Sequence, residues 1–171
     1  YFMGSMNKMK PSTGEIDKWK KKYPSHYLVS CKLDGISALY VSENNKLYTR
    51  GNGVEGQDIS YMIPYLNIPD FKKENYDNIV VRGELIMPTA VFEKKWASKY
   101  ANPRNLVAGR TGAKTIKKGI SDIKFVAYEI VGGEMTKPTK QFRKLKSLGF
   151  TVVRQQKVKS ISLDLFANTL L

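Results

Sequence analysis

Apolar and polar positions along this chain follow two different periods. Short apolar or alternating runs, each bounded by glycine, proline or charged residues, predict strands. These strands fall at 27–34, 36–41, 47–50, 79–88, 123–131 and 150–153. Longer stretches with apolar residues three or four positions apart predict helices at 12–23, 89–100, 137–148 and 160–171, and an Asn-Pro pair predicts a further helix start at Pro103.

Residue types at the ends of these segments predict their boundaries. We expect Ser12 or Thr13 to cap the first helix, and Thr89 to cap the second. Gly149 is expected to end the third helix in a left-handed conformation. Gly35 lies between two apolar runs, which predicts a tight turn joining two strands.

Composition narrows the possible partners. Lys and Arg number 29 against 15 Asp and Glu, a formal net charge of +14. That surplus favours a polyanionic partner, and nucleic acid is favoured over a membrane because no basic amphipathic helix with an aromatic face is present. No apolar run approaches the length of a membrane span, and no signal peptide opens the chain. A length of 171 residues suits one domain.

Cysteine and histidine are each represented once, which limits the possible chemistry. With Cys31 alone, no internal disulfide can form, and a reducing, cytoplasmic compartment is expected. With His26 alone, a Ser-His triad and a histidine-rich metal site are nearly excluded. The candidate chemistry therefore rests on lysine, arginine and carboxylate side chains.

The stretch from Ser30 to Gly35 holds the candidate nucleophile. Alternation along a strand would place Ser30, Lys32 and Asp34 on one face. A lysine flanked by apolar strand residues is poorly solvated, and desolvation disfavours the ammonium, which would make the neutral amine of Lys32 available for attack. Asp34 would hold that amine or ligate a metal. The pattern K-x-D-G is weak by itself, and a solvated lysine beside an Asp-Gly turn is the alternative.

Charged residues at strand ends and within strands form the remaining candidates. Arg50 precedes a glycine-rich loop whose backbone can approach a ligand, so it is placed to meet a phosphate or ribose, although a surface arginine is equally compatible. Glu84 lies within an apolar strand, where a carboxylate is costly without a partner or a role. It shares a face with Arg82, and the alternative is that the two simply pair with each other or with neighbouring residues. Arg104 in a first helical turn is placed to meet an anion.

In this order, the motifs resemble the adenylation domain of NAD-dependent DNA ligases. The matching segments are Lys32–Gly35 with K-x-D-G, Thr49–Asp58 with T-R-G-D-G-x-x-G-E-D, Val81–Glu84 with V-R-G-E, and Ala101–Gly109 with A-N-P-R-N-x-x-A-G. The last is the most specific, because ATP-dependent ligases share the lysine motif without it. Met3–Met6 resembles the M-L-S-L segment of the family, and the resemblance covers nearly the whole chain.

This resemblance implies a covalent nucleotidyltransferase fold of the α+β class, with antiparallel and mixed sheets and flanking helices. It implies that Lys32 attacks NAD to form a lysyl-AMP, with Mg²⁺ assisting, and that the adenylyl group then passes to the 5′-phosphate of nicked double-stranded DNA. Asp34 would belong to the same catalytic motif. The cofactor-binding residues implied are Ser5, Met6, Lys32, Arg50, Glu84 and Tyr128, with Tyr128 stacking on adenine. Arg104 and Arg110 would contact DNA or AMP phosphates.

Departures from the family pattern put some of these roles in question. Ser30 stands where the family usually has the glutamate that reads the adenine amino group, and Asn52 replaces an aspartate of the loop. An arginine expected eight residues after Arg104 falls on Gly112, and Arg110 is the nearest substitute. The downstream lysine motifs and the other ligase modules are absent, so residues 1–171 are expected to be a partial adenylation domain that seals nicks poorly by itself.

Two other classes of function stay open at this stage. One is a nucleotidyltransferase that uses ATP or GTP, such as a polynucleotide ligase or a capping enzyme. The other is a catalytically idle DNA-binding fragment of the same fold, which the changes at Ser30 and Asn52 and the missing lysine motifs favour slightly.

Overall fold

The structure, a computed structural model, describes residues 1–71, 77–113, 115–132 and 137–161. The chain divides into two compact units, whereas its length suggested one domain. The first unit contains Tyr1–Met3 and Lys32–Val153, and the second contains Gly4–Cys31 and Arg154–Leu171.

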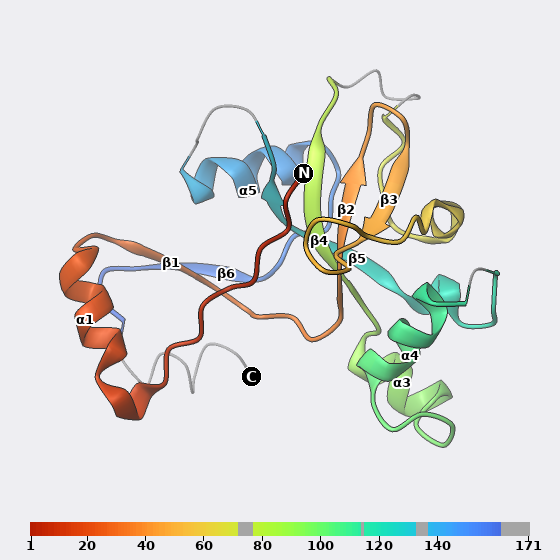
Figure 1. The fold of residues 1–171 in the computed structure, drawn as a ribbon, viewed down its shortest axis with the longest axis horizontal. Coiled ribbons are helices and arrows are strands. Elements are labelled where there is room, and N and C mark those ends of the chain that lie inside the picture. Colours follow the sequence, from red (N-terminus) through yellow and green to blue (C-terminus); the bar gives the residue numbers. More distant parts are fainter. Residues whose placement is uncertain (72–76, 114, 133–136, 162–171) are drawn as a thin grey trace. The chain divides into compact units, whose positions relative to one another are not determined.

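A four-stranded antiparallel sheet forms the centre of the first unit, with strand order β3-β2-β4-β5 (Figure 1). Its strands are β2 (Ile36–Val41), β3 (Lys46–Thr49), β4 (Val80–Ile86) and β5 (Lys124–Ile130). One face carries apolar side chains such as Tyr40, Leu85 and Phe125, each at most 1% exposed. Alternation places Ser37 and Glu84 on the other face, where they oppose each other across β2 and β4.

Helices and aromatic rings complete the apolar core of this unit. Phe150 packs against the rings of Tyr40, Phe71 and Phe125, with centroid separations between 5.7 and 6.2 Å. The described helical elements are η2 (Ser60–Tyr65), α3 (Thr89–Lys95), α4 (Pro103–Thr111), η3 (Ile120–Asp122) and α5 (Pro138–Ser147). Helix α5 contacts β5, and its inward residues Phe142 and Leu145 are buried because they lie on its one apolar side.

The second unit is small and built on a two-stranded antiparallel sheet. Its described elements are η1 (Pro11–Thr13), α1 (Glu15–Lys22), β1 (Tyr27–Ser30) and β6 (Gln155–Val158). Trp19 of α1 packs its ring against Tyr23 and Tyr27, at centroid distances of 5.4 and 5.3 Å. None of the helices in the described parts of either unit combines the length and the hydropathy that a membrane crossing requires.

Several predictions made from the sequence are confirmed. The strands expected at 36–41, 47–50, 79–88 and 123–131 correspond to β2, β3, β4 and β5. Helix α4 begins at Pro103, where the Asn102 side chain accepts a hydrogen bond from the Asn105 amide at 2.8 Å. Gly149 follows α5 with a φ of 84°, which favours glycine because it has no Cβ.

The expected strand–turn–strand around Gly35 is wrong. Strand β1 ends at Ser30, residues 31–34 are irregular, and β1 pairs with β6 rather than with β2. The segments on both sides of Gly35 are apolar, which is why they were expected to pair with each other. In the structure they belong to different sheets, where β1 pairs with β6 and β2 pairs with β3 and β4. The strand expected at 150–153 reduces to a parallel bridge between Ala127 and Val152, and the strand that does form is β6.

The expected helix caps also need correction. Gly14, with a φ of 68°, precedes α1, so neither Ser12 nor Thr13 occupies the cap position. Pro88 precedes α3 in place of the expected Thr89, and α3 ends at Lys95, earlier than the expected residue 100. The helix expected at 160–171 lies almost wholly outside the described residues.

Candidate active site

A pocket of about 440 Å³ lies in the first unit, at the polar face of the sheet. Segments from four parts of the chain line it: the residues that lead into β2, the end of β3 with its glycine-rich loop, β4, and helix α4. These segments bring together the following residues that the sequence singled out: Lys32, Asp34, Arg50, Glu84 and Arg104. The lysine motif, the arginine loop, the V-R-G-E strand and the N-P-R helix therefore meet at one site.

Lys32 and Asp34 are exposed on the irregular segment before β2. The expectation that apolar strand neighbours leave Lys32 poorly solvated is wrong, because that segment is not a strand and the side chain reaches solvent. Asp34 forms an ion pair with Arg104, with Nη1 and Oδ1 separated by 3.4 Å and the two side chains 58% and 79% exposed for arginine and aspartate respectively. An exposed pair of this kind contributes little to stability, so both groups remain available to a ligand.

Gly35 brings the lysine segment against β4. A Cβ built on Gly35 would overlap the carbonyl oxygen of Leu85 and approach the Glu84 side chain at 3.0 Å. Gly83 is similarly restricted, since its Cβ would lie 2.6 Å from the Phe125 ring. The glycines of the lysine and V-R-G-E motifs are therefore required for close approach of neighbouring segments, and this approach places Lys32 beside Glu84.

Glu84 is the buried carboxylate of the site, with 9% of the residue exposed. Its Oε2 accepts a hydrogen bond from the Ser37 hydroxyl at 2.8 Å, across the β2–β4 pair. Burial raises the pKa of the Glu84 carboxyl, and the Ser37 hydroxyl, the Lys32 ammonium, the Gly35 amide and the Arg104 guanidinium each oppose that rise. Arg82 forms its ion pair elsewhere, with Glu129 at 3.4 Å.

Tyr128 stands next to the pocket without lining it. A register shift between Arg82 and Gly83 aligns Arg82 with Glu129 and Gly83 with Ala127, so Tyr128 is the extra residue of a β-bulge. The Arg82 guanidinium lies 5.8 Å from the centre of its ring. Burial raises the pKa of the Tyr128 hydroxyl, and a hydrogen bond with Ser37 opposes the rise.

The glycine-rich loop holds Arg50 at the pocket edge. The Arg50 amide donates to the Ser37 carbonyl at 3.0 Å, and its Nε donates to the Met3 carbonyl at 3.0 Å. Asn52 accepts from the amides of Val54 and Glu55 at 2.9 and 2.8 Å, which closes the loop. These bonds use the side-chain oxygen that asparagine and aspartate share, so the departure at Asn52 preserves the loop.

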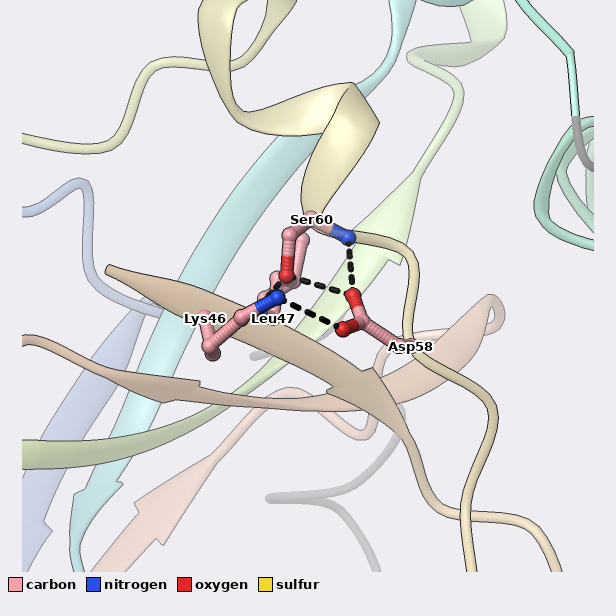
Figure 2. A network of polar contacts seen from close by, with 4 residues as sticks. All are labelled: Lys46, Leu47, Asp58 and Ser60. Carbon is pink, nitrogen blue, oxygen red and sulfur yellow. Dashed lines mark hydrogen bonds and ion pairs between the residues drawn. The ribbon is translucent and has the colours of Figure 1, made fainter. Parts of the chain in front are cut away.

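Asp58, at the end of the same loop, anchors it to β3 (Figure 2). Its Oδ1 accepts from the amide and hydroxyl of Ser60 at 2.9 and 2.6 Å, and its Oδ2 accepts from Lys46 Nζ at 3.0 Å. The Ser60 hydroxyl in turn accepts from the Leu47 amide at 3.0 Å. The Ser60 hydroxyl and amide, followed by Lys46, lower the pKa of Asp58 to about 2. Asp58 therefore stabilises the loop that carries Arg50.

The two candidate arginines of helix α4 differ in their surroundings. Arg104 lines the pocket and is mostly exposed. Arg110 is 7% exposed: it donates to the Lys118 carbonyl at 2.8 Å and to the Tyr100 hydroxyl at 2.9 Å, and its guanidinium lies over the Trp96 and Tyr100 rings. The expectation that Arg110 meets a phosphate is not supported, because these contacts occupy the guanidinium; Gly112 lines the pocket instead.

Other candidates lie outside this pocket or were not foreseen. Ser5 and Met6 belong to the second unit, as does Ser30, which opposes Gln155 across β1 and β6. Their roles stay predictions. Sequence reasoning missed Ser37, which lines the pocket and contacts Glu84. The sequence feature that could have identified Ser37 is its position: it is a small polar residue inside an apolar strand, two residues after the glycine of K-x-D-G.

Comparisons with known proteins converge on one family. A family model described as the NAD-dependent DNA ligase adenylation domain matches residues 6–167. The chain is 38% identical over 176 residues to a DNA ligase of Acanthamoeba polyphaga mimivirus, which covers 99% of this chain and 27% of that protein. It is 38% identical over 136 residues to putative DNA ligase 205R of Invertebrate iridescent virus 6, which covers 76% of this chain and 22% of that protein.

A solved structure named Pmar-Lig_Pre resembles the fold. Its TM-score is 0.51 at 16% sequence identity, and the match covers 86% of this chain and 35% of that one. At this identity the likeness concerns the fold alone, and it agrees with an α+β nucleotidyltransferase architecture. The chain spans about a quarter of the length of the viral relatives it matches.

Proposed function

Because the chain belongs to the family of NAD-dependent DNA ligase adenylation domains, we propose that it carries out the adenylation step of DNA ligation. NAD is the substrate, and Lys32 is the residue that receives AMP. The adenylyl group is then passed to the 5′-phosphate of nicked double-stranded DNA. The observation that carries this proposal is the pocket that gathers Lys32, Glu84, Arg50 and Arg104.

The pocket has the size and the charges that such a reaction needs. A volume of about 440 Å³ lies within the range typical of small-molecule sites. Transfer of a phosphoryl-type group depends mainly on positioning and on neutralising the charge of the phosphate oxygens. Arg50 and Arg104 supply positive charge from two different segments of the pocket lining, the end of β3 and helix α4. Lys32 lines the same pocket, on the segment that Gly35 holds against β4.

In the proposed reaction, the neutral amine of Lys32 attacks the α-phosphorus of NAD. A P–N bond forms, the bond from that phosphorus to the bridging oxygen breaks, nicotinamide mononucleotide leaves with the electron pair, and the lysine loses a proton. In the second step an oxygen of the DNA 5′-phosphate attacks the same phosphorus, and the lysine amine departs. Exposure of Lys32 leaves it accessible to both substrates.

The remaining residues would bind and orient the nucleotide. Glu84 would accept hydrogen bonds from ribose hydroxyls, since it is a buried acceptor at the pocket wall. Tyr128 would stack on adenine with its aromatic ring. Ser5 and Met6 would offer backbone groups to the base. In proteins Mg²⁺ is held by one or two carboxylates together with substrate phosphates, and the exposed carboxylate of Asp34 fits that donor set.

The DNA partner and the compartment follow from charge and composition. A net charge of +14 suits the phosphate backbone of a duplex, and Arg104 offers a mostly exposed guanidinium beside Lys32 in the pocket lining. The single cysteine, Cys31, supports a reducing, cytoplasmic location.

The test is covalent labelling of the 171-residue polypeptide. The protein is incubated with NAD labelled in its adenylate, or with labelled ATP, and intact mass and peptide mapping follow the label. We expect AMP on Lys32 from NAD, and no label in the Lys32→Ala variant. Labelling from ATP alone would support the ATP-dependent alternative. Label at another residue, or undiminished label in Lys32→Ala, would overturn the proposal.

A further inference from the structure

Ser37 occupies the position on β2 that faces Glu84 on β4. The two side chains point to the same face of the sheet, and the Ser37 Oγ lies 2.8 Å from Glu84 Oε2. An ionised carboxylate is an acceptor only, so the serine hydroxyl donates this bond. The backbone amide of Gly35 also donates to the Glu84 carboxylate. Two groups that lie two residues apart on one segment thus hold the carboxylate at the pocket wall.

A carboxylate held in this way keeps capacity for a ligand. It offers about four lone-pair sites, and the serine hydroxyl and the glycine amide use only part of them. Because Glu84 is 9% exposed, it cannot rely on water to fix its orientation or to stabilise its charge. The groups that face it come from every neighbouring element: Lys32 before β2, Arg104 on α4 and Tyr128 on β5, with Arg82 on β4 itself.

The same hydroxyl also reaches the residue next to the pocket. The Ser37 hydroxyl and the Glu84 carboxylate both act on the pKa of the Tyr128 hydroxyl, so the three groups lie near one another at this wall. Glu84 is the group proposed to bind ribose, and Tyr128 is the group proposed to stack on adenine. A single small polar residue therefore links the two groups that would hold the two halves of an adenosine.

We infer that Ser37 is a positioning residue for adenosine recognition: its hydroxyl holds Glu84 for the ribose hydroxyls and sets Tyr128 beside it for the base. This inference rests on the proposed function, because it requires that Glu84 and Tyr128 bind the nucleotide. Ser37 itself need not touch the nucleotide. Removal of its oxygen should loosen both groups, while a threonine, which keeps that oxygen, should preserve them.

A matched control exists at the end of the same strand. Ser42, 4% exposed, accepts a hydrogen bond from the Ile79 amide at 2.7 Å and does not line the pocket. Ser42→Ala removes a buried hydroxyl from the same hairpin and so measures the purely structural effect of such a change. Ser37→Ala and Ser37→Thr are compared with it.

The experiment has two readouts on the 171-residue polypeptide. Calorimetry measures AMP binding between about pH 5 and about pH 8, and carboxyl-carbon NMR follows the titration of Glu84, assigned with Glu84→Gln. For Ser37→Ala we expect AMP affinity to fall about fivefold, the loss of one hydrogen bond. Because a donor to the ionised form is lost, the Glu84 titration midpoint should move to higher pH. Ser37→Thr should restore both, and Ser42→Ala should change only thermal stability.

Two results would overturn the inference. One is a Ser37→Ala variant whose Glu84 titration and AMP affinity match the wild type. The other is a Ser42→Ala variant that shifts both readouts as far as Ser37→Ala does. If the wild-type protein binds neither AMP nor NAD, the proposed function fails instead, and the NMR titration alone still decides whether Ser37 controls the Glu84 carboxylate.

Discussion

Arg104 and Arg110 show how two arginines of the same helix acquire different surroundings. Both lie on α4 and belong to the same basic stretch of sequence. Arg104 is mostly exposed and lines the pocket, whereas Arg110 is buried and donates to a carbonyl and a tyrosine hydroxyl. The resemblance to the ligase family placed both near a phosphate, but a motif does not reveal which guanidinium is already occupied by other contacts.

Alanine substitution should mainly lower AMP labelling at Arg104 and mainly lower the unfolding free energy at Arg110. Arg104→Ala should change the unfolding free energy by no more than about 0.5 kcal/mol, because its ion pair is exposed, and should lower AMP labelling. Arg110→Ala should lower the unfolding free energy by about 2–4 kcal/mol, since the Lys118 carbonyl and Tyr100 hydroxyl lose their donor. Urea unfolding and labelling with NAD measure the two effects. Equal destabilisation by both variants would contradict this assignment.

Glu84 gives a prediction about pH. Burial raises its folded-state pKa above the ordinary value of 4.5, so the folded protein binds the proton more tightly than the unfolded chain. Ionisation therefore costs stability: the cost is absent below about pH 4.5 and is fully present once the pH exceeds the raised folded-state pKa. Glu84→Gln keeps an acceptor for Ser37 and cannot ionise. Its thermal midpoint relative to wild type should rise as pH increases from about 4 to about 8; a difference independent of pH would contradict the prediction.

At the level of elements, local patterns predicted the strands of the first unit better than their partners. Alternation and turn residues placed β2, β3, β4 and β5, because each of these signals lies within a few residues. The pairing of β1 with β6 joins residues more than a hundred positions apart, and no local pattern specifies it. The same limit applies to the site: the motifs named Lys32 and Glu84, but the contact between Ser37 and Glu84 depends on the β2–β4 register.

Gly35 tests how closely the lysine segment must approach β4. Gly35→Ala places a Cβ against the Leu85 carbonyl oxygen, so the segment must move away. We expect a loss of about 2 kcal/mol or more in unfolding free energy and a loss of AMP labelling on Lys32. Gly109→Ala in α4 is the control: nothing lies within 4 Å of its Cβ, and alanine in a helix should stabilise by about 0.5–1 kcal/mol. Similar effects from the two changes would contradict the close-approach argument.

The loop that carries Arg50 depends on the contacts of Asp58 with Ser60 and Lys46 (Figure 2). The folded-state pKa of Asp58 is lowered from 3.8 to about 2, so its stabilisation is present above about pH 4 and disappears as the pH falls through about 2. Asp58→Asn should lower the thermal midpoint at pH 7 by about 2–4 °C, equivalent to about 1 kcal/mol. The difference should vanish in acid. Lys46→Met leaves the Asp58 carboxylate ionised and its charge-assisted bonds from Ser60 intact, so it should have a smaller effect; an equal effect would assign the stabilisation to the ion pair.

At the scale of the whole molecule, the polypeptide combines a nucleotide-sized pocket with a strongly positive charge. The pocket belongs entirely to the first unit, which contains the lysine, the loop, the V-R-G-E strand and the N-P-R helix. The match to the mimivirus DNA ligase covers 99% of this chain. It covers only 27% of the mimivirus protein. Covalent capture of AMP needs a pocket of this kind, whereas sealing a nick also requires that the two DNA ends be held around it.

The two steps of the proposed reaction should therefore separate in this 171-residue polypeptide. We expect AMP to be captured from NAD by Lys32, while sealing of a nicked duplex should be slow or undetectable, because alignment of the DNA ends contributes much of the rate. The measurement is a gel assay with a labelled nicked duplex, in which capture and sealing are followed in the same reaction. Lys32→Ala should abolish both, and its duplex binding, which depends on other cations, should persist and weaken as salt rises. Efficient sealing by the polypeptide alone would contradict this separation and show that the 171 residues already position the nick.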